Sequence, residues 1–124
     1  MTEIGNERIL AGGKDRRGED LPWNDHPKFP GVHMKTLVPG CDTQGRFSCL
    51  LIRIDPGMAI GRHVHEDSWE LHEVLQGTGT GTLLEARRDY APGTVAVLPQ
   101  GELHSVEAGP EGLTLLAKFV PAAG

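Results

Sequence analysis

From Val32 onward the sequence consists of short apolar runs separated by residues that form turns. Four of these turns combine Pro and Gly, where Pro restrains one φ and Gly takes positive φ if the turn needs it. No window has a sustained apolar repeat of 3.6 residues, so no long amphipathic helix is expected. About eight short strands in one domain predict an all-β sandwich or small barrel. The turns are Asp55-Pro56-Gly57, Ala91-Pro92-Gly93, Pro99-Gln100-Gly101 and Pro110-Glu111-Gly112.

The first 30 residues differ from the rest, because they are polar, mixed in charge and contain three prolines between Pro22 and Pro30. Proline removes a backbone donor and favours extended neighbours, so residues 1–30 are expected to form an extended arm. Trp23 and Phe29 would anchor this arm on the domain or on a partner subunit. Residues 31–124 are expected to form the barrel. Its predicted strands are 32–38, 46–54, 59–65, 69–76, 79–86, 94–99, 103–108 and 113–120.

Length and charge narrow the classes of function. A chain of 124 residues is long enough for one hydrophobic core. Its net charge of -5 argues against nonspecific nucleic-acid binding, which needs clustered basic residues. The sequence contains no apolar segment long enough to predict membrane insertion or secretion, so a cytoplasmic location is expected. The two cysteines, Cys41 and Cys49, are expected to be reduced, with Cys49 packed inside a strand.

A cluster of polar residues between Gly61 and Gly77 calls for a chemical explanation. Side chains alternate along a strand, so His63 and His65 share a face, about 7 Å apart along the chain. A turn at residues 66–68 would fold Glu70 back beside them. Two imidazoles and a carboxylate are a common ligand set for divalent iron, manganese, zinc and related ions. His104, after a second turn, is a candidate fourth ligand from a distant strand.

Alternatives to this interpretation remain open. His63 and His65 could be surface histidines on a polar hairpin, and His104 could simply end a turn. Glu73 could replace Glu70 as the acidic ligand, although the spacing favours Glu70 and alternation directs Glu73 to the opposite face.

The two histidine segments together resemble the conserved motifs of the cupin superfamily. The first motif is matched by Gly57, His63, His65, Glu70 and Gly77, and the second by Gly93, Pro99, Gly101 and His104. The family usually has Asn where this chain has Ala108, a difference that concerns local hydrogen bonding more than metal ligands. The resemblance covers roughly residues 32–120. It implies a jelly-roll barrel with one divalent metal held by His63, His65, Glu70 and His104, and a homodimer in which terminal strands are exchanged.

Several other side chains have more than one interpretation. His72 shares a face with Glu70 and is our candidate catalytic residue, as a general base, substrate contact or second-shell donor, or else a plain interior histidine. Arg53 would clamp an anionic substrate if its face is inward, but an arginine in solvent is the favoured interpretation. Tyr90 is expected to pack in a loop. Met34, Met58 and Trp69 are expected in packing or interfaces, and Arg62 should point outward.

Three histidines and one carboxylate leave about two open positions on an octahedral ion. The sequence therefore predicts a mononuclear metal-dependent enzyme, with iron, manganese, nickel or zinc, acting on a small oxygen-rich organic substrate. Dioxygenase-type oxidative cleavage is the first prediction, and isomerase, lyase or decarboxylase chemistry the next. The alternative is a binding or sensor module that holds a small ligand without converting it. Ligands and fold do not choose between these reactions.

Overall fold

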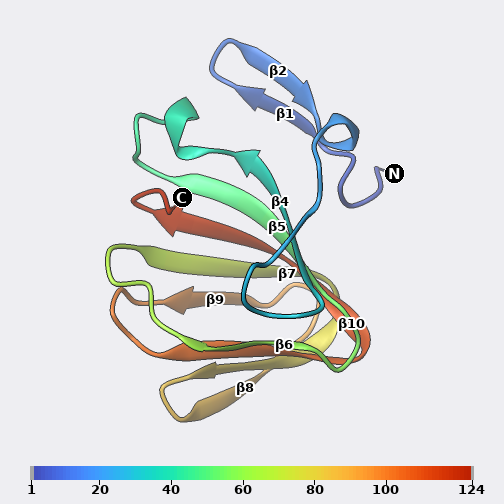
Figure 1. Cartoon of the computed structure of the whole chain (residues 1–124), viewed down its shortest axis with the longest axis vertical. Helices are drawn as coiled ribbons and strands as arrows, with labels where there is room; N and C mark the ends of the chain where they lie inside the picture. Colours follow the sequence, from blue (N-terminus) through green and yellow to red (C-terminus); the bar gives the residue numbers. More distant parts are fainter. Residues whose placement is uncertain (1, 124) are drawn as a thin grey trace.

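The computed structural model describes residues 2–123, which form an almost entirely β-structured molecule (Figure 1). In these residues no helix has the length and apolar composition needed to cross a membrane. Two short 3-10 turns, η1 (Gly18–Asp20) and η2 (Gly40–Asp42), interrupt the strands. The strands are β1 (Arg8–Ala11), β2 (Lys14–Arg17), β3 (Asn24–Asp25), β4 (Val32–Val38), β5 (Ser48–Ile54), β6 (Ala59–His63), β7 (Trp69–Leu83), β8 (Ala86–Tyr90), β9 (Val95–Leu98) and β10 (His104–Val120).

Two long strands, β7 and β10, join the two sides of the barrel. They pair with each other along most of their length. The first half of β10 pairs with β6 and its second half with β5, while β7 pairs with β9 before its midpoint and with β8 after it. Each long strand therefore belongs to both layers, and the antiparallel layers enclose one interior. This confirms the predicted all-β jelly-roll barrel.

The long strands correct part of the strand prediction. Residues 69–76 and 79–86 were expected as two strands, but most of them form β7. Residues 103–108 and 113–120 were also expected as two strands, and all of them except residue 103 lie in β10. Pro110 and Gly112 were expected in a turn that separates two strands. Instead the register shifts between Ala108 and Leu113, and β10 continues after this irregularity. A proline without an N–H interrupts one ladder locally, and a bulge absorbs the interruption without ending the strand.

Tyr90 was expected in a loop and this was wrong. It ends β8, which pairs with β7 and, within residues 2–123, with no other strand, and its side chain is buried. The charged residues before it obscured this strand, because an edge strand tolerates charged side chains on its exposed faces.

Strand β5 explains how the core is divided. Leu50, Ile52 and Ile54 face the barrel interior, while Leu51 faces a separate outer cluster. Both faces of the strand are covered, which is why its sequence is a nearly continuous apolar run. Cys49 is buried within it as expected, Cys41 is exposed, and neither forms a disulfide among residues 2–123. The outer cluster consists of Ile9, Leu37 and Leu51, with Leu21, Trp23, Leu75 and Leu116 packed around it.

The N-terminal segment provides the other side of that outer cluster. It contains a β1–β2 hairpin that was not anticipated from the sequence, and β3 pairs with β4 (Figure 1). The buried Lys35 ammonium donates hydrogen bonds to the carbonyls of Gly5 (2.8 Å) and Gly18 (2.7 Å). After the hairpin the chain crosses the front of the barrel before it enters β4, as Figure 1 shows.

Candidate metal centre

Three strands bring the predicted ligands together. His63 ends β6 and pairs in register with His104 at the start of β10, while Glu70 lies in β7. His65 follows β6 in the connection to β7. One potential ligand atom from each of His63, His65, Glu70 and His104 lies within 4.8 Å of the others. The cluster contains Glu70 and not Glu73, and its binding of a metal stays a prediction.

Backbone carbonyls orient two of the imidazoles. His63 Nδ1 lies 2.8 Å from the Gly61 carbonyl oxygen, and His104 Nδ1 lies 3.0 Å from that of Glu102. A carbonyl only accepts, so each Nδ1 carries the proton and each Nε2 keeps a lone pair. A hydrogen bond from the other ring nitrogen is the usual way in which proteins orient a metal-binding histidine.

The Glu70 carboxylate lies between these rings. Its Oε1 is 3.3 Å from His65 Nε2 and 3.2 Å from His104 Nε2. The geometry is unsuited to hydrogen bonding, so within residues 2–123 the buried Glu70 Oε1 and His104 Nε2 have no partner. Two buried acceptors that face each other are costly unless a cation lies between them. The residues present therefore fit a divalent metal with imidazole and carboxylate ligands.

The charges of the cluster agree with this fit. Burial by itself would raise the pKa of Glu70, but the neighbouring rings of His104 and His72 outweigh it and lower the pKa to about 2. Burial lowers the pKa of His63 and of His65, so both rings are neutral at pH 7. Burial acts in the same direction on His104, but the Glu70 carboxylate outweighs it and raises the pKa of His104. A carboxylate with neutral imidazoles is the form that metal binding requires.

His72 connects the cluster to Tyr90. Its Nε2 lies 2.6 Å from Glu70 Oε2, and its Nδ1 lies 2.9 Å from the Tyr90 hydroxyl. Burial, followed by the Glu70 charge, raises the pKa of Tyr90 to about 12, so the hydroxyl keeps its proton and donates it to Nδ1. His72 then donates from Nε2 to Glu70. Both ring nitrogens are engaged, and of the roles considered for His72 these contacts favour that of a donor that holds the Glu70 carboxylate.

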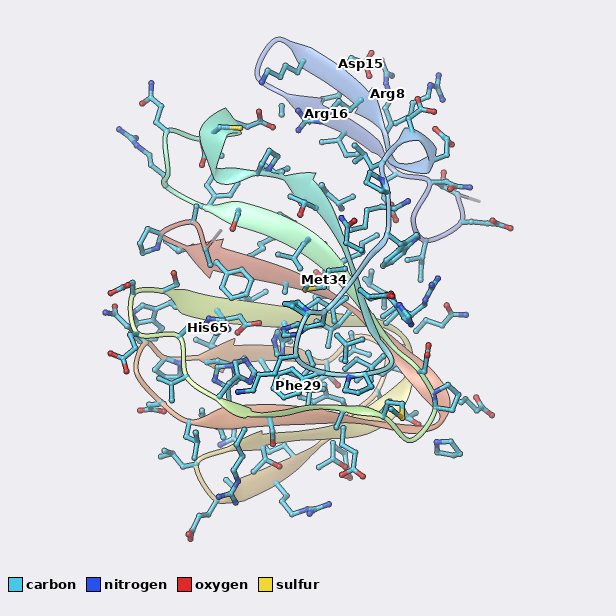
Figure 2. The ribbon with its side chains drawn as sticks, viewed as in Figure 1. Arg8, Asp15, Arg16, Phe29, Met34 and His65 are labelled. Atoms are coloured by element: carbon cyan, nitrogen blue, oxygen red, sulfur yellow. The ribbon has the colours of Figure 1, made fainter. Side chains whose placement is uncertain are left out.

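An apolar cavity of about 210 Å³ adjoins the cluster. His63, His65, Glu70 and His72 line part of it, and His26 is a further polar residue in its wall. Met34, expected in packing or at an interface, is part of the wall, and so is His65; Figure 2 labels both. The sequence analysis gave His26 no role. The apolar lining of the cavity consists of Met34, Leu50, Ile52, Ile60, Val106, Phe119 and Ala123.

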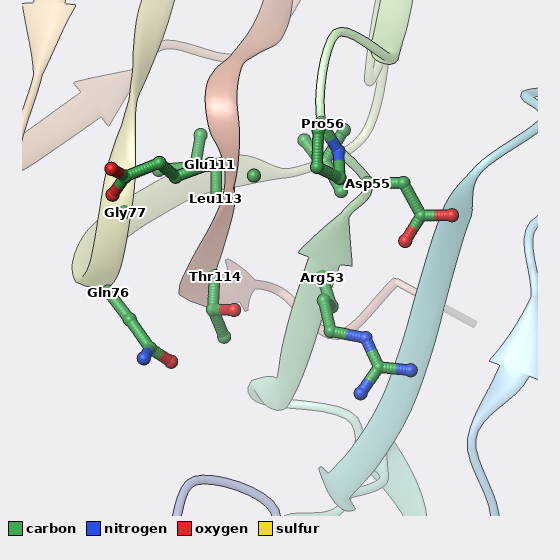
Figure 3. A pocket seen from close by; sticks show the side chains of 10 residues that line it. Arg53, Asp55, Pro56, Gln76, Gly77, Glu111, Leu113 and Thr114 are labelled. Carbon is green, nitrogen blue, oxygen red and sulfur yellow. The ribbon is translucent and has the colours of Figure 1, made fainter.

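Other residues considered from the sequence lie outside this cavity. Arg53 is exposed, and its guanidinium carbon lies 4.5 Å from the centre of the Trp23 ring, which confirms the favoured interpretation. Figure 3 shows Arg53, Thr114 and Gln76 side by side in a separate open hollow on the outer face of the sheet. Arg62 is exposed as expected, and Trp69 is half exposed.

Comparison with known families agrees with the fold and with the motif spacing. A family model described as "AraC-like ligand binding domain" matches residues 48–117. The chain belongs to this family of the cupin superfamily. The matched segment contains all four cluster residues of this cupin. A search of the curated proteins found no match.

Solved structures share the cupin fold at low sequence identity. An RmlC-like cupin from Shewanella frigidimarina is 19% identical, covers 86% of this chain and 89% of its own, and has a TM-score of 0.75. A predicted oxalate decarboxylase from Thermotoga maritima is 22% identical over 98% of this chain and 99% of its own, with a TM-score of 0.75. The polyketide cyclase RemF from Streptomyces resistomycificus is 20% identical over 92% of this chain and 78% of its own, with a TM-score of 0.73.

Proposed function

We propose that this cupin binds one divalent transition metal through His63, His65, Glu70 and His104, and that it converts a small organic molecule in the adjoining cavity. One observation carries the proposal. Glu70 Oε1 and His104 Nε2 are buried 3.2 Å apart, and among the described residues neither has a hydrogen-bond partner. A cation bound between them removes the cost of two unsatisfied acceptors.

The reaction class rests on the ligand set and on the cavity. A divalent ion with three imidazoles and one carboxylate keeps about two positions for other ligands and acts as a Lewis acid toward an oxygen of the substrate. His72 and Tyr90 hold the Glu70 carboxylate in place, and the apolar walls exclude water from the bound molecule. Oxidative cleavage of the dioxygenase type is our first candidate, followed by isomerisation, elimination or decarboxylation. Structures of this fold include a cyclase and a predicted decarboxylase, so fold alone leaves the class open.

A binding or sensor module is the second candidate. It is favoured by His72, whose two ring nitrogens are both engaged and therefore not available to a substrate proton. The family description, a ligand-binding domain, also agrees with it. In this case the metal and the cavity hold a small ligand that leaves unchanged.

Metal analysis followed by reconstitution tests both candidates. We expect the wild-type protein to bind one equivalent of iron, manganese, nickel or zinc, and His63→Ala to lose this binding. His33→Ala, which changes a histidine outside the cluster, is the matched control. Each metal form is then incubated with a panel of enols, diketones and small acids. Conversion supports the enzyme, a ligand recovered unchanged supports the binding module, and a wild-type protein that binds no metal overturns both.

We further propose that the protein is a homodimer. Trp69, Val95, Val97 and Val120 are each about half exposed, on the neighbouring strands β7, β9 and β10. A second copy of the chain would remove these apolar side chains from water. Sedimentation velocity should give a dimer that Val97→Lys dissociates, and a wild-type monomer at micromolar concentration contradicts the proposal.

A further inference from the structure

We propose that His26 is a ligand-positioning residue that donates its Nε2–H to an oxygen of a molecule bound in the cavity. The inference rests on the proposed function, since it concerns the molecule that the cluster would hold. His26 lies in the loop between β3 and β4 and lines the same cavity as His63, His65 and Glu70. It comes from a segment distant in sequence from both histidine motifs.

The hydrogen bonds of the loop determine which nitrogen carries the proton. His26 Nδ1 accepts the backbone N–H of Lys28 (3.0 Å) and that of Phe29 (3.2 Å). A nitrogen that accepts has no proton, so the neutral ring carries its proton on Nε2. Burial, together with the charge of Lys28, lowers the pKa of His26 and keeps the ring neutral at pH 7. Among the described residues no protein group accepts this Nε2–H.

Phe29 holds the loop in a defined place beside the cluster. Its ring centre lies 4.9 Å from that of His26 and 6.1 Å from that of His63. The ring packs on the backbone of Gly61, where a Cβ atom would lie 3.0 Å from Phe29 Cε1. The backbone N–H of His26 also donates to the Val32 carbonyl (2.8 Å). The His26 donor is therefore positioned by contacts that need no ligand.

The cavity selects a class of ligand. Its polar lining consists of His26, His63, His65, Glu70 and His72, and the rest of its wall is apolar. A sugar would leave several hydroxyl groups unpaired against such a wall, at a cost for each. A matching molecule has an apolar body, such as a benzene ring or a branched alkyl chain. One oxygen-bearing group, such as a carboxylate, meets the cluster, and a neutral acceptor such as a carbonyl meets His26.

Matched probes test this assignment. The ortho, meta and para isomers of acetylbenzoate carry a carbonyl acceptor, and the corresponding isopropylbenzoates have nearly the same shape without one. Calorimetric titration of the zinc-loaded protein should show at least one acetyl isomer bound about fivefold more tightly than its isopropyl partner, the value of one neutral hydrogen bond. His26→Phe keeps a ring but no donor, and should abolish this preference without weakening the isopropyl probe by more than about twofold.

A second variant separates ligand positioning from loop stabilisation. His26→Asn keeps a side-chain oxygen that can accept the N–H groups of Lys28 and Phe29, but its shorter side chain withdraws the donor from the cavity. We expect His26→Asn to have the melting temperature of the wild type but to lose the preference for the acetyl over the isopropyl probe. A preference that persists in His26→Asn, or that is absent for all three isomers in the wild type, overturns the proposal.

The outcome is independent of the metal assignment. The His26 donor does not belong to the cluster, so the same titrations are repeated on metal-free protein. If zinc fails to bind but the His26-dependent preference is found, the proposed function fails and the His26 assignment stands. If zinc binds and no preference depends on His26, the His26 assignment fails and the proposed function stands.

Discussion

At the scale of the residue, Glu70 converts a group of neutral rings into a site for a cation. Glu70→Gln keeps the size of the side chain but removes the charge that balances a divalent ion. Zinc affinity should fall by at least about 100-fold, the upper range for changes outside the first shell. Competition with a chromogenic chelator measures this. Glu73→Gln, on the other face of β7, is the control, and an equal loss in both variants would contradict the role given to Glu70.

Tyr90 is the residue on which the orientation of His72 depends. Tyr90→Phe removes the hydroxyl that lies 2.9 Å from His72 Nδ1 and leaves this buried ring nitrogen without its donor. The free energy of unfolding of metal-free protein should fall by about 1–3 kcal/mol, and zinc affinity by about tenfold. Urea denaturation and chelator competition measure the two effects. If Tyr90→Phe changes neither the unfolding free energy nor the zinc affinity, packing alone orients His72.

At the scale of the element, strand β6 and the loop before β4 depend on each other through Gly61. Gly61→Ala places a methyl group 3.0 Å from Phe29 Cε1, so the ring must move. We expect a loss of about 1–2 kcal/mol in unfolding free energy and faster hydrogen exchange in residues 26–31. Adding Phe29→Leu, a smaller side chain, should restore part of the loss. If hydrogen exchange in residues 26–31 is unchanged in Gly61→Ala, then Phe29 does not hold this loop in place.

At the scale of the whole molecule, Lys35 attaches the N-terminal hairpin to the barrel. The residue is 3% exposed, and its ammonium donates to two backbone carbonyls and lies 5.1 Å from the centre of the Trp23 ring. Lys35→Met keeps the apolar stem but leaves both buried carbonyls without this donor. Unfolding free energy should fall by about 1–3 kcal/mol, with faster proteolysis within residues 1–20. Lys118→Met, at an exposed position, is the control, and equal proteolysis of both variants would contradict the attachment.

His33 makes a second long-range connection, and its effect depends on pH. Its Nδ1 lies 2.7 Å from Asp25 and its Nε2 3.1 Å from Asp55, which joins β3 and β4 to the turn after β5. These carboxylates, Asp55 first, raise the pKa of His33 above 6.5 in the folded state. The stabilisation is therefore complete below pH 6.5 and is lost as pH rises through the raised folded pKa.

His33→Gln should therefore cost about 0.5–1 kcal/mol at pH 6, as expected for a partly exposed ion pair, and less at pH 8.5. Urea denaturation at the two pH values measures the difference. The contribution is small because water screens the carboxylates of Asp25 and Asp55, whose side chains are 87% and 49% exposed. A cost that does not change with pH would mean that the ring stabilises the fold by packing alone.

Local patterns predicted the parts of this cupin that repeat along one strand. Alternation placed Glu70 and His72 on one face, and turn chemistry marked most strand ends correctly. The same rules failed at Pro110 and before Tyr90, because neighbouring strands continued the pairing where local signals predicted an interruption. His26 was overlooked for a similar reason, since its role depends on a loop packed across the barrel and no spacing in the sequence reports that.

From the order of residues we could predict the all-β fold class, the strand faces and the four residues that could bind one ion, because these follow from periodicity, turn residues and motif spacing. Three placements depend on the folded chain: His72 contacts Glu70 and Tyr90, Arg53 faces outward against the Trp23 ring, and His26 enters the cavity wall. The reason is physical: alternation specifies on which face of a strand a side chain lies, but only packing between distant segments specifies what covers that face.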